Sequence, residues 1–182
     1  MASNPLVERE ERYGSFLIQQ LNQGKLTKPF LEQMLHSFSV HKYCFETVAE
    51  RTDIQFLRAT VVWVLREWFD LPEETVDDLI LVYEEVVANV LRHSYQAHEA
   101  KWLRYCLVRD NHQLVLTVVD RGAGGRNPAL PERFATISKE GRPPLQHRGG
   151  LGLYLMKRIM DSIEYVPGGS ENVITMRKTC FA

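Results

Sequence analysis

The spacing of apolar residues divides the chain into helical and extended segments. Apolar residues recur at intervals of three and four, as in an amphipathic helix, over residues 6–38, 53–69, 73–95 and 153–161. Extended patterns, typical of strands, cover residues 42–48, 102–108, 113–119, 162–166 and 172–178. Helices that are segregated from a sheet are typical of a two-layer α/β (α+β) sandwich. We therefore expect a mixed, mostly antiparallel sheet that is covered on one face by helices.

One short connection within this pattern predicts a hairpin. The segments 102–108 and 113–119 are joined across Asp110 and Asn111, residue types that tolerate the left-handed backbone conformation of a tight turn. These two strands should pair antiparallel.

The first 40 residues form a helical segment that precedes the predicted sheet. Asn22-Gln23-Gly24 interrupts the helical pattern and divides it into two pieces. We expect an N-terminal helical extension over residues 1–39 and a single core domain over residues 40–182. The apolar stripe of Phe16, Leu17 and Leu21 serves either to dock a partner or second copy, or to cover the domain.

Composition and charge exclude some classes of partner. The 182 residues include 22 basic and 23 acidic side chains, for a net charge of −1, without a long block of one sign. Nucleic acid and anionic membranes are therefore not the expected partners. No apolar run approaches the roughly 18 residues of a membrane span, and the first dozen residues are rich in charge, so a cytoplasmic protein is expected.

The cysteines indicate neither a disulfide framework nor a zinc site. Cys44, Cys106 and Cys180 are odd in number, far apart in sequence and outside any CxxC spacing. We expect all three to be reduced residues of strands.

A polar pair interrupts the apolar helix predicted over residues 73–95. Glu85 and Asn89 are four residues apart and therefore share one face of the helix. Polar groups among valines and leucines destabilise the fold unless they are bound. Either they hold a ligand, or Glu85 faces solvent and Asn89 is a satisfied core amide. Glu84 lies about 100° around the helix and is expected to face solvent.

Two glycine-containing motifs follow further along the chain. Asp120, Gly122 and Gly124 form a DxGxG motif at the end of a predicted strand, where glycine lets the backbone approach a ligand closely. A run from Gly149 to Gly152 opens the last predicted helix and would present free amides to a phosphate. Each motif alone also fits an ordinary turn. The loop of about 25 residues between them is long enough to be functional.

The three motifs in this order resemble those of the GHKL nucleotide-binding fold, which is shared by gyrase-type ATPases, MutL, the heat-shock chaperone ATPase and histidine kinases. The motifs are ExxxN from Glu85, DxGxG from Asp120, and GxGL from Gly150. Within that superfamily the chain is most similar to the small anti-sigma-factor serine/threonine kinases of bacterial partner-switching systems. The resemblance covers about residues 40–180 and implies an ATP lid over about residues 125–149.

The resemblance implies roles for the polar pair and for the DxGxG motif. Asn89 would place an oxygen on Mg²⁺. Glu85 would be the base or orienting group for the attacking hydroxyl of a protein serine or threonine, or for water in an ATPase. Asp120 would accept a hydrogen bond from the adenine amino group, with Gly122 and Gly124 close to the base.

The resemblance also implies a phosphate site at the start of the last helix. Backbone amides of the GxGL motif would bind the phosphates, and this motif consists of Gly150, Leu151, Gly152 and Leu153. Arg148 would add positive charge from the lid, although a solvated arginine fits this position equally. His93 matches a recurrent histidine of the anti-sigma branch and also fits a structural role.

By resemblance, the expected function is that of an ATP-dependent serine/threonine protein kinase and anti-sigma factor. Such a protein uses ATP and Mg²⁺, releases ADP, binds a sigma factor and phosphorylates an anti-sigma-factor antagonist of the STAS type. A homodimer fits the same resemblance. The alternative is a regulatory module of the GHKL fold that holds a protein partner in a nucleotide-dependent way and has no kinase activity. A third alternative is that the glycines form turns only and that no nucleotide binds.

Overall fold

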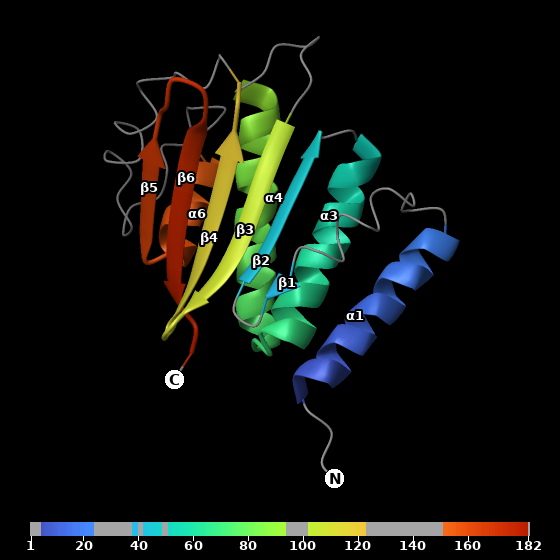
Figure 1. Ribbon diagram of the computed structural model, residues 1–182. Coiled ribbons are helices and arrows are strands. Elements are labelled where there is room, and N and C mark those ends of the chain that lie inside the picture. Colours follow the sequence, from blue (N-terminus) through green and yellow to red (C-terminus); the bar gives the residue numbers. More distant parts are fainter. Residues whose placement is uncertain are drawn as a thin grey trace.

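The computed structural model describes residues 5–23, 38–39, 42–48, 51–93, 102–122 and 151–181. Its helices are α1 (Pro5–Asn22), α3 (Arg51–Trp63), the π-helix η1 (Val64–Trp68), α4 (Glu73–His93) and α6 (Leu151–Ile159). Its strands are β1 (Phe38–Ser39), β2 (Lys42–Val48), β3 (Trp102–Asp110), β4 (Gln113–Asp120), β5 (Ser162–Val166) and β6 (Asn172–Thr179) (Figure 1).

The strands form one six-stranded sheet with the order β1-β2-β3-β4-β6-β5. Each pairing between neighbours in this order is antiparallel, which confirms the predicted, mostly antiparallel sheet. The hairpin between β3 and β4 is also confirmed, because Asp110 pairs with Gln113 and Asn111 adopts a φ of 52°.

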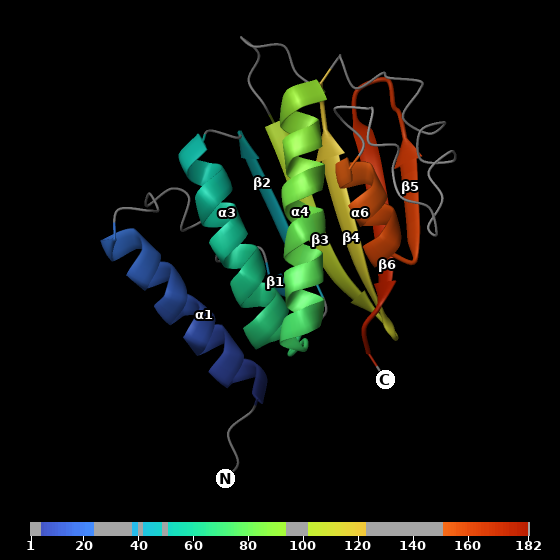
Figure 2. The same ribbon diagram turned by 180° about the vertical axis from the view of Figure 1, so that it is seen from behind.

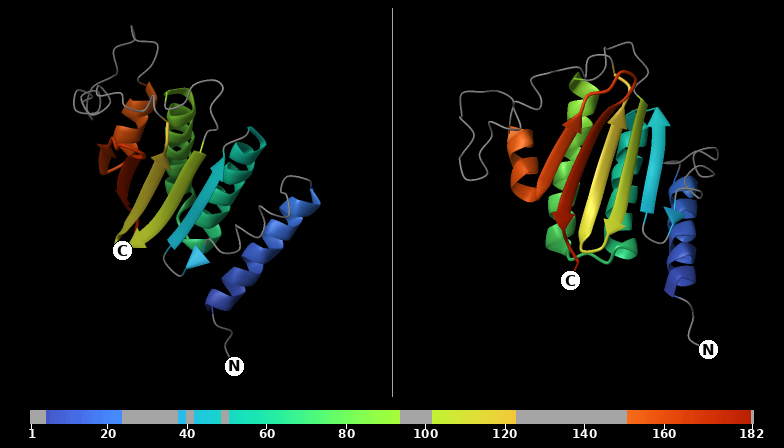
Figure 3. Two further views of the ribbon diagram at one scale, coloured as in Figure 1. Left: turned by 45° about the horizontal axis from the view of Figure 1, so that its top comes forward. Right: turned by 60° about the vertical axis from the view of Figure 1, so that its left-hand side comes forward.

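The described helices cover a single face of the sheet. Figures 1 and 2 show α3, α4 and α6 on one side of the strands, while α1 lies outside α3; the oblique views agree (Figure 3). Alternate residues of β3 and β4 are buried toward the helices, including Tyr105 and Leu116. The two-layer α/β sandwich is therefore the observed architecture, and the other face of the sheet carries no described helix. No described helix combines the length and apolar character that a membrane crossing requires.

Helix α1 packs against α3 through part of its apolar stripe. Leu17 is fully buried and Tyr13 is buried. The Tyr13 ring is tilted against Trp63 with a centroid distance of 4.9 Å, and the Phe16 ring stacks on Trp63 at 5.8 Å. Arg12 also forms an ion pair with Glu67 at 2.9 Å. These contacts favour covering of the domain as the role of the α1 stripe.

The N-terminal extension and the helix that follows it differ from the sequence prediction. The second helical piece of the N-terminal extension lies outside the described residues, except that its last position, Phe38, is in β1 and pairs with Tyr43. The helix predicted over residues 53–69 begins at Arg51 and changes to π-helix at Val64. The Phe69 N–H donates to the Val64 carbonyl at 2.9 Å, five residues earlier, and apolar periodicity does not show such a change of winding.

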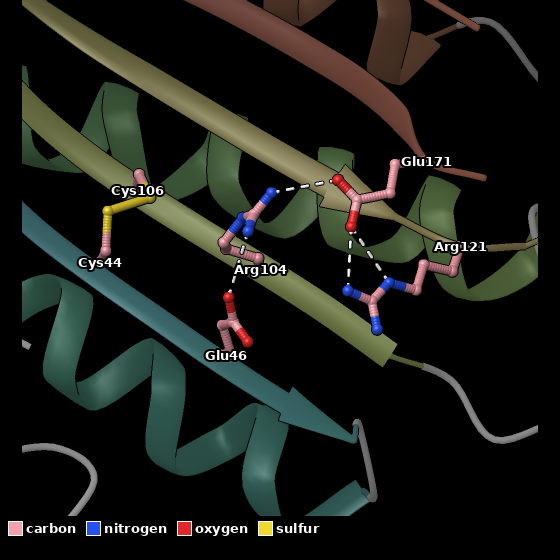
Figure 4. A network of polar contacts seen from close by, with 6 residues as sticks. All are labelled: Cys44, Glu46, Arg104, Cys106, Arg121 and Glu171. Atoms are coloured by element: carbon pink, nitrogen blue, oxygen red, sulfur yellow. Dashed lines mark hydrogen bonds and ion pairs between the residues drawn. A yellow bond between two sulfur atoms is a disulfide. The ribbon is translucent and has the colours of Figure 1, made fainter. Parts of the chain in front are cut away.

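The expectation that all cysteines are reduced is wrong for two of them. Cys44 and Cys106 are directly opposite each other in the β2–β3 register and form a disulfide (Figure 4). Their separation of 62 residues in sequence gave no spacing signal, because only the strand pairing brings them together. Cys180 is a free cysteine, as predicted.

Candidate active site

Three elements meet at one end of the molecule. The C-terminal half of α4, the N-terminus of α6 and the C-terminal end of β4 lie side by side in Figures 1, 2 and 3. Helix α4 also packs directly against α6. The described residues of the ExxxN, DxGxG and GxGL motifs are therefore brought to the same end of the fold.

Glu85 lies against the first turn of α6. A Cβ atom added to Gly152 would overlap the Glu85 carboxylate, with Oε2 as the nearest atom. A side chain at position 152 would require the Glu85 carboxylate to move from this position. The N-terminal end of a helix favours negative charge, so α6 supports the Glu85 carboxylate at this position.

Asn89 follows Glu85 by one helical turn. Both residues are half-buried, so neither is fully solvated nor sealed in the core. Within the described residues, no hydrogen bond or ion pair involves either side chain. Both residues therefore lie at the edge of the core.

Asp120 is a buried carboxylate at the end of β4. Its side chain is 3% exposed, and its Oδ1 atom accepts hydrogen bonds from the Gly122 N–H at 2.9 Å and from Asn172 Nδ2 at 2.9 Å. Burial of a carboxylate is costly unless hydrogen-bond donors surround it. The two donors therefore hold this carboxylate in a fixed position at the end of β4.

Two neighbours of Asp120 were not predicted. Asn172 Nδ2 also donates to the Gly122 carbonyl at 3.1 Å, so that its amide fixes both the carboxylate and the turn after it. Burial, followed by the negative charge of Asp120, raises the pKa of Tyr165 on β5, which places that phenol near the carboxylate. The sequence signal that could have identified Asn172 is its polar side chain at the start of a predicted strand. Tyr165 gave no such signal, because tyrosine is common in strands.

This arrangement agrees with a comparison to known families. Residues 48–178 match the profile of the histidine kinase-like ATPase domain. The chain belongs to this family. The resemblance to the GHKL superfamily is thereby confirmed, and membership implies that the chain binds ATP or ADP.

Curated relatives of this ATPase domain include serine-protein kinases and an anti-sigma factor. A serine-protein kinase RsbW of Halalkalibacterium halodurans is 29% identical over 93 residues, which cover 50% of this chain and 55% of the relative. RsbW of Bacillus pumilus is 26% identical over 109 residues, or 58% of this chain and 65% of the relative. An anti-sigma F factor of Clostridium beijerinckii is 25% identical over 128 residues, or 69% and 85%. The chain thus matches less than two thirds of the length of either RsbW protein.

The remaining predicted residues of the ATPase domain divide into two groups. Leu151 is exposed at the start of α6, whereas the Leu153 side chain is buried in the core, so only the backbone of Leu153 can face a ligand. Gly124, Arg148, Gly150 and the lid at about residues 125–149 lie outside the described residues, as does the side chain of His93.

Glu84 lies away from the site, as predicted. Its carboxylate is exposed and forms an ion pair with Arg58 of α3. Neighbouring acids of α4 thus have different surroundings in this ATPase domain, one in an ion pair and one against Gly152.

Protein side chains alone do not form a metal site in the described residues. No group of three or more His, Cys, Asp or Glu side chains there is arranged to hold an ion. A magnesium ion that is held partly by nucleotide phosphates needs only one or two protein oxygens, and Asn89 can supply one.

Proposed function

We propose that the chain is an ATP-dependent serine/threonine protein kinase that acts as an anti-sigma factor. It would bind a sigma factor and phosphorylate an anti-sigma-factor antagonist in the cytoplasm. The kinase domain would comprise residues 40–182, with residues 1–39 as an N-terminal extension. Support comes from membership of the histidine kinase-like ATPase family and from the names of the RsbW and anti-sigma F relatives.

The contact between Glu85 and Gly152 carries the proposal. It places a carboxylate at the N-terminus of α6, the position at which free backbone amides are available to phosphates. A base near the phosphates is what phosphoryl transfer to a protein hydroxyl requires. Glu85 would orient the serine or threonine hydroxyl and accept its proton.

Asp120 fits the adenine end of the nucleotide. Its Oδ1 atom is held by two N–H donors, and the carboxylate can accept a further hydrogen bond from the adenine amino group. Gly122, which is buried beside it, and Gly124 would leave space for the base. The donor and acceptor chemistry of this end therefore fits adenine.

Asn89 and the start of α6 fit the phosphate end. The Asn89 amide oxygen would contact Mg²⁺, whose role when bound is to bridge and neutralise the phosphate oxygens. Amides of the segment Gly150–Leu153, which includes Leu151 and Gly152, would bind phosphate oxygens, with Arg148 adding positive charge. These groups would position the phosphates, while Glu85 would accept the proton of the attacking hydroxyl.

The proposal is tested with two neighbouring carboxylates. Partners are isolated by pull-down from the native host with and without Mg·ATP, and are then incubated with the purified protein and [γ-³²P]ATP. Glu85→Gln should abolish labelling of the antagonist and leave Mg·ADP binding intact. Glu84→Gln, a matched control on the same helix, should label the antagonist as the wild type does.

Two other results would change the proposal. If partner binding depends on ATP but no partner is labelled, the kinase activity is refuted, and the result supports a nucleotide-dependent regulatory module instead. Absence of heat on titration with Mg·ADP would refute the nucleotide site itself.

A further inference from the structure

Two consecutive residues hold the end of β4 from opposite faces of the sheet. Asn172 is the first residue of β6, and Glu171 directly precedes it. Asn172 is the register partner of Asp120 and is buried on the helix-covered face. Glu171 lies on the open face of the sheet, which is the face without a described helix (Figure 4).

On the covered face, the Asn172 amide makes two hydrogen bonds with the adenine-site turn. Its Nδ2 atom donates to Asp120 Oδ1 at 2.9 Å and to the Gly122 carbonyl at 3.1 Å. The two acceptors lie on either side of Arg121, so a single amide group fixes the carboxylate relative to the backbone. Hydrogen bonds to a charged acceptor are stronger than those to a neutral one.

On the open face, Glu171 joins two arginines. Its Oε1 atom accepts hydrogen bonds from Arg121 Nε at 3.1 Å and Nη2 at 3.0 Å, and its Oε2 atom accepts one from Arg104 at 3.2 Å (Figure 4). The Arg121 guanidinium lies 3.7 Å from the Trp102 ring centroid, and Arg104 also pairs with Glu46 at 3.2 Å. Arg121 directly follows Asp120, so this cluster restrains the same turn from the other side.

The turn between β5 and β6 fixes the position of the two residues. A Cβ atom added to Gly168 would overlap the backbone carbonyl of Glu171, whereas one added to Gly169 would meet nothing within 4 Å. The backbone before β6 is therefore held tightly against the turn, and the glycine at 168 is required for this contact.

We propose that Asn172 and Glu171 are positioning residues for the nucleotide, and that they orient Asp120 toward the amino group of adenine. This inference rests on the proposed nucleotide site. Asn172 fixes the carboxylate directly, and Glu171 fixes the turn that carries it. Selection of adenine over a base with an oxygen in place of the amino group then depends on both residues.

The test measures binding of Mg·ADP and Mg·IDP by calorimetry, because the hypoxanthine of IDP lacks the amino group. Asn172→Ala should weaken ADP binding by roughly 10-fold or more, as expected for a lost hydrogen bond to a charged acceptor, and should reduce the ADP-to-IDP preference. Asn172→Thr, which keeps one donor, should recover part of that preference. A merely structural role would weaken both nucleotides equally.

Glu171 has matched controls on the same side of the sheet. Glu171→Gln should reduce ADP affinity by a smaller factor, about threefold, while Glu164→Gln, at an exposed glutamate of β5, should leave it unchanged. Gly168→Ala should behave like Glu171→Gln, and Gly169→Ala like the wild type. Melting of each variant without nucleotide shows whether it is folded.

The outcomes separate this inference from the proposed function. If Asp120→Asn loses ADP binding and Asn172→Ala retains both affinity and preference, the positioning role is refuted and the nucleotide site stands. If the wild type binds neither nucleotide, both are refuted.

Discussion

Reduction of the Cys44–Cys106 disulfide should lower the free energy of unfolding by about 4 kcal/mol. The bond links residues 62 positions apart, and a cross-link of that span removes about 14 cal/mol/K of chain entropy from the unfolded state, or about 4.3 kcal/mol at 25 °C. In a chain of this size each 1 kcal/mol changes Tm by roughly 2–4 °C. The reduced protein should therefore melt roughly 8–16 °C lower.

The assay compares urea unfolding with and without an excess of a dithiol, which donates two electrons and two protons to give two thiols. Circular dichroism follows the helices. The double variant Cys44→Ser/Cys106→Ser should be destabilised and insensitive to the dithiol. Cys180→Ser is the control, because Cys180 is free, and it should respond to the dithiol as the wild type does.

Counting thiols provides an independent check. The chain has three cysteines, so the protein unfolded in urea should react with one equivalent of a thiol reagent before reduction and three afterwards. Three reactive thiols before reduction, or identical unfolding curves with and without dithiol, would refute the disulfide and the entropy argument with it.

Other predictions concern the core and the site. Gly152→Ala should reduce phosphoryl transfer in the labelling assay by about 100-fold. The new methyl group would displace Glu85, and a displacement of about 1 Å in a reacting group has an effect of this size. An unchanged rate would contradict the placement of that carboxylate. Tyr105→Phe should raise the free energy of unfolding by about 1 kcal/mol in urea denaturation, because the Tyr105 hydroxyl is buried without a partner in the described structure; loss of stability would show that the hydroxyl is bound. Mg·ADP at 100 times its Kd should stabilise the fold by about 2.7 kcal/mol, visible as a rise in Tm that Asp120→Asn removes.

The strands and helices could be predicted because their patterns are local. The segment predicted to be a strand over residues 42–48 is β2 with the same bounds, since Tyr43 and Phe45 alternate with Lys42 and Glu46. Helix α4 begins at Glu73, as predicted from the proline and two acids before the apolar stripe, and the Val76 N–H donates to the Pro72 carbonyl at 2.9 Å. These signals lie within one turn or one strand.

The contacts that hold the site together could not be predicted because they join distant positions. Asn172 and Asp120 are 52 residues apart, and only the β4–β6 register makes them neighbours. The same is true of the disulfide, which depends on the β2–β3 register. A slip of one residue in either register would turn one partner to the opposite face of the sheet, and no pattern within a single strand specifies that register.

The polar pair of α4 depends both on a local pattern and on a contact between distant parts of the chain. Helical spacing places Glu85 and Asn89 on one face and turns Glu84 away, and the ion pair of Glu84 with Arg58 agrees with this. Spacing alone cannot say what lies opposite Glu85, because that depends on how α6 packs against α4. The absence of a Cβ at Gly152 lets the carboxylate lie at the start of α6, where charge that develops on a phosphate would also be stabilised. Glu84→Gln and Glu85→Gln remove the same charge from adjacent positions, so a difference in phosphoryl transfer between them must arise from the position and contacts of each carboxylate rather than from the net charge of the helix.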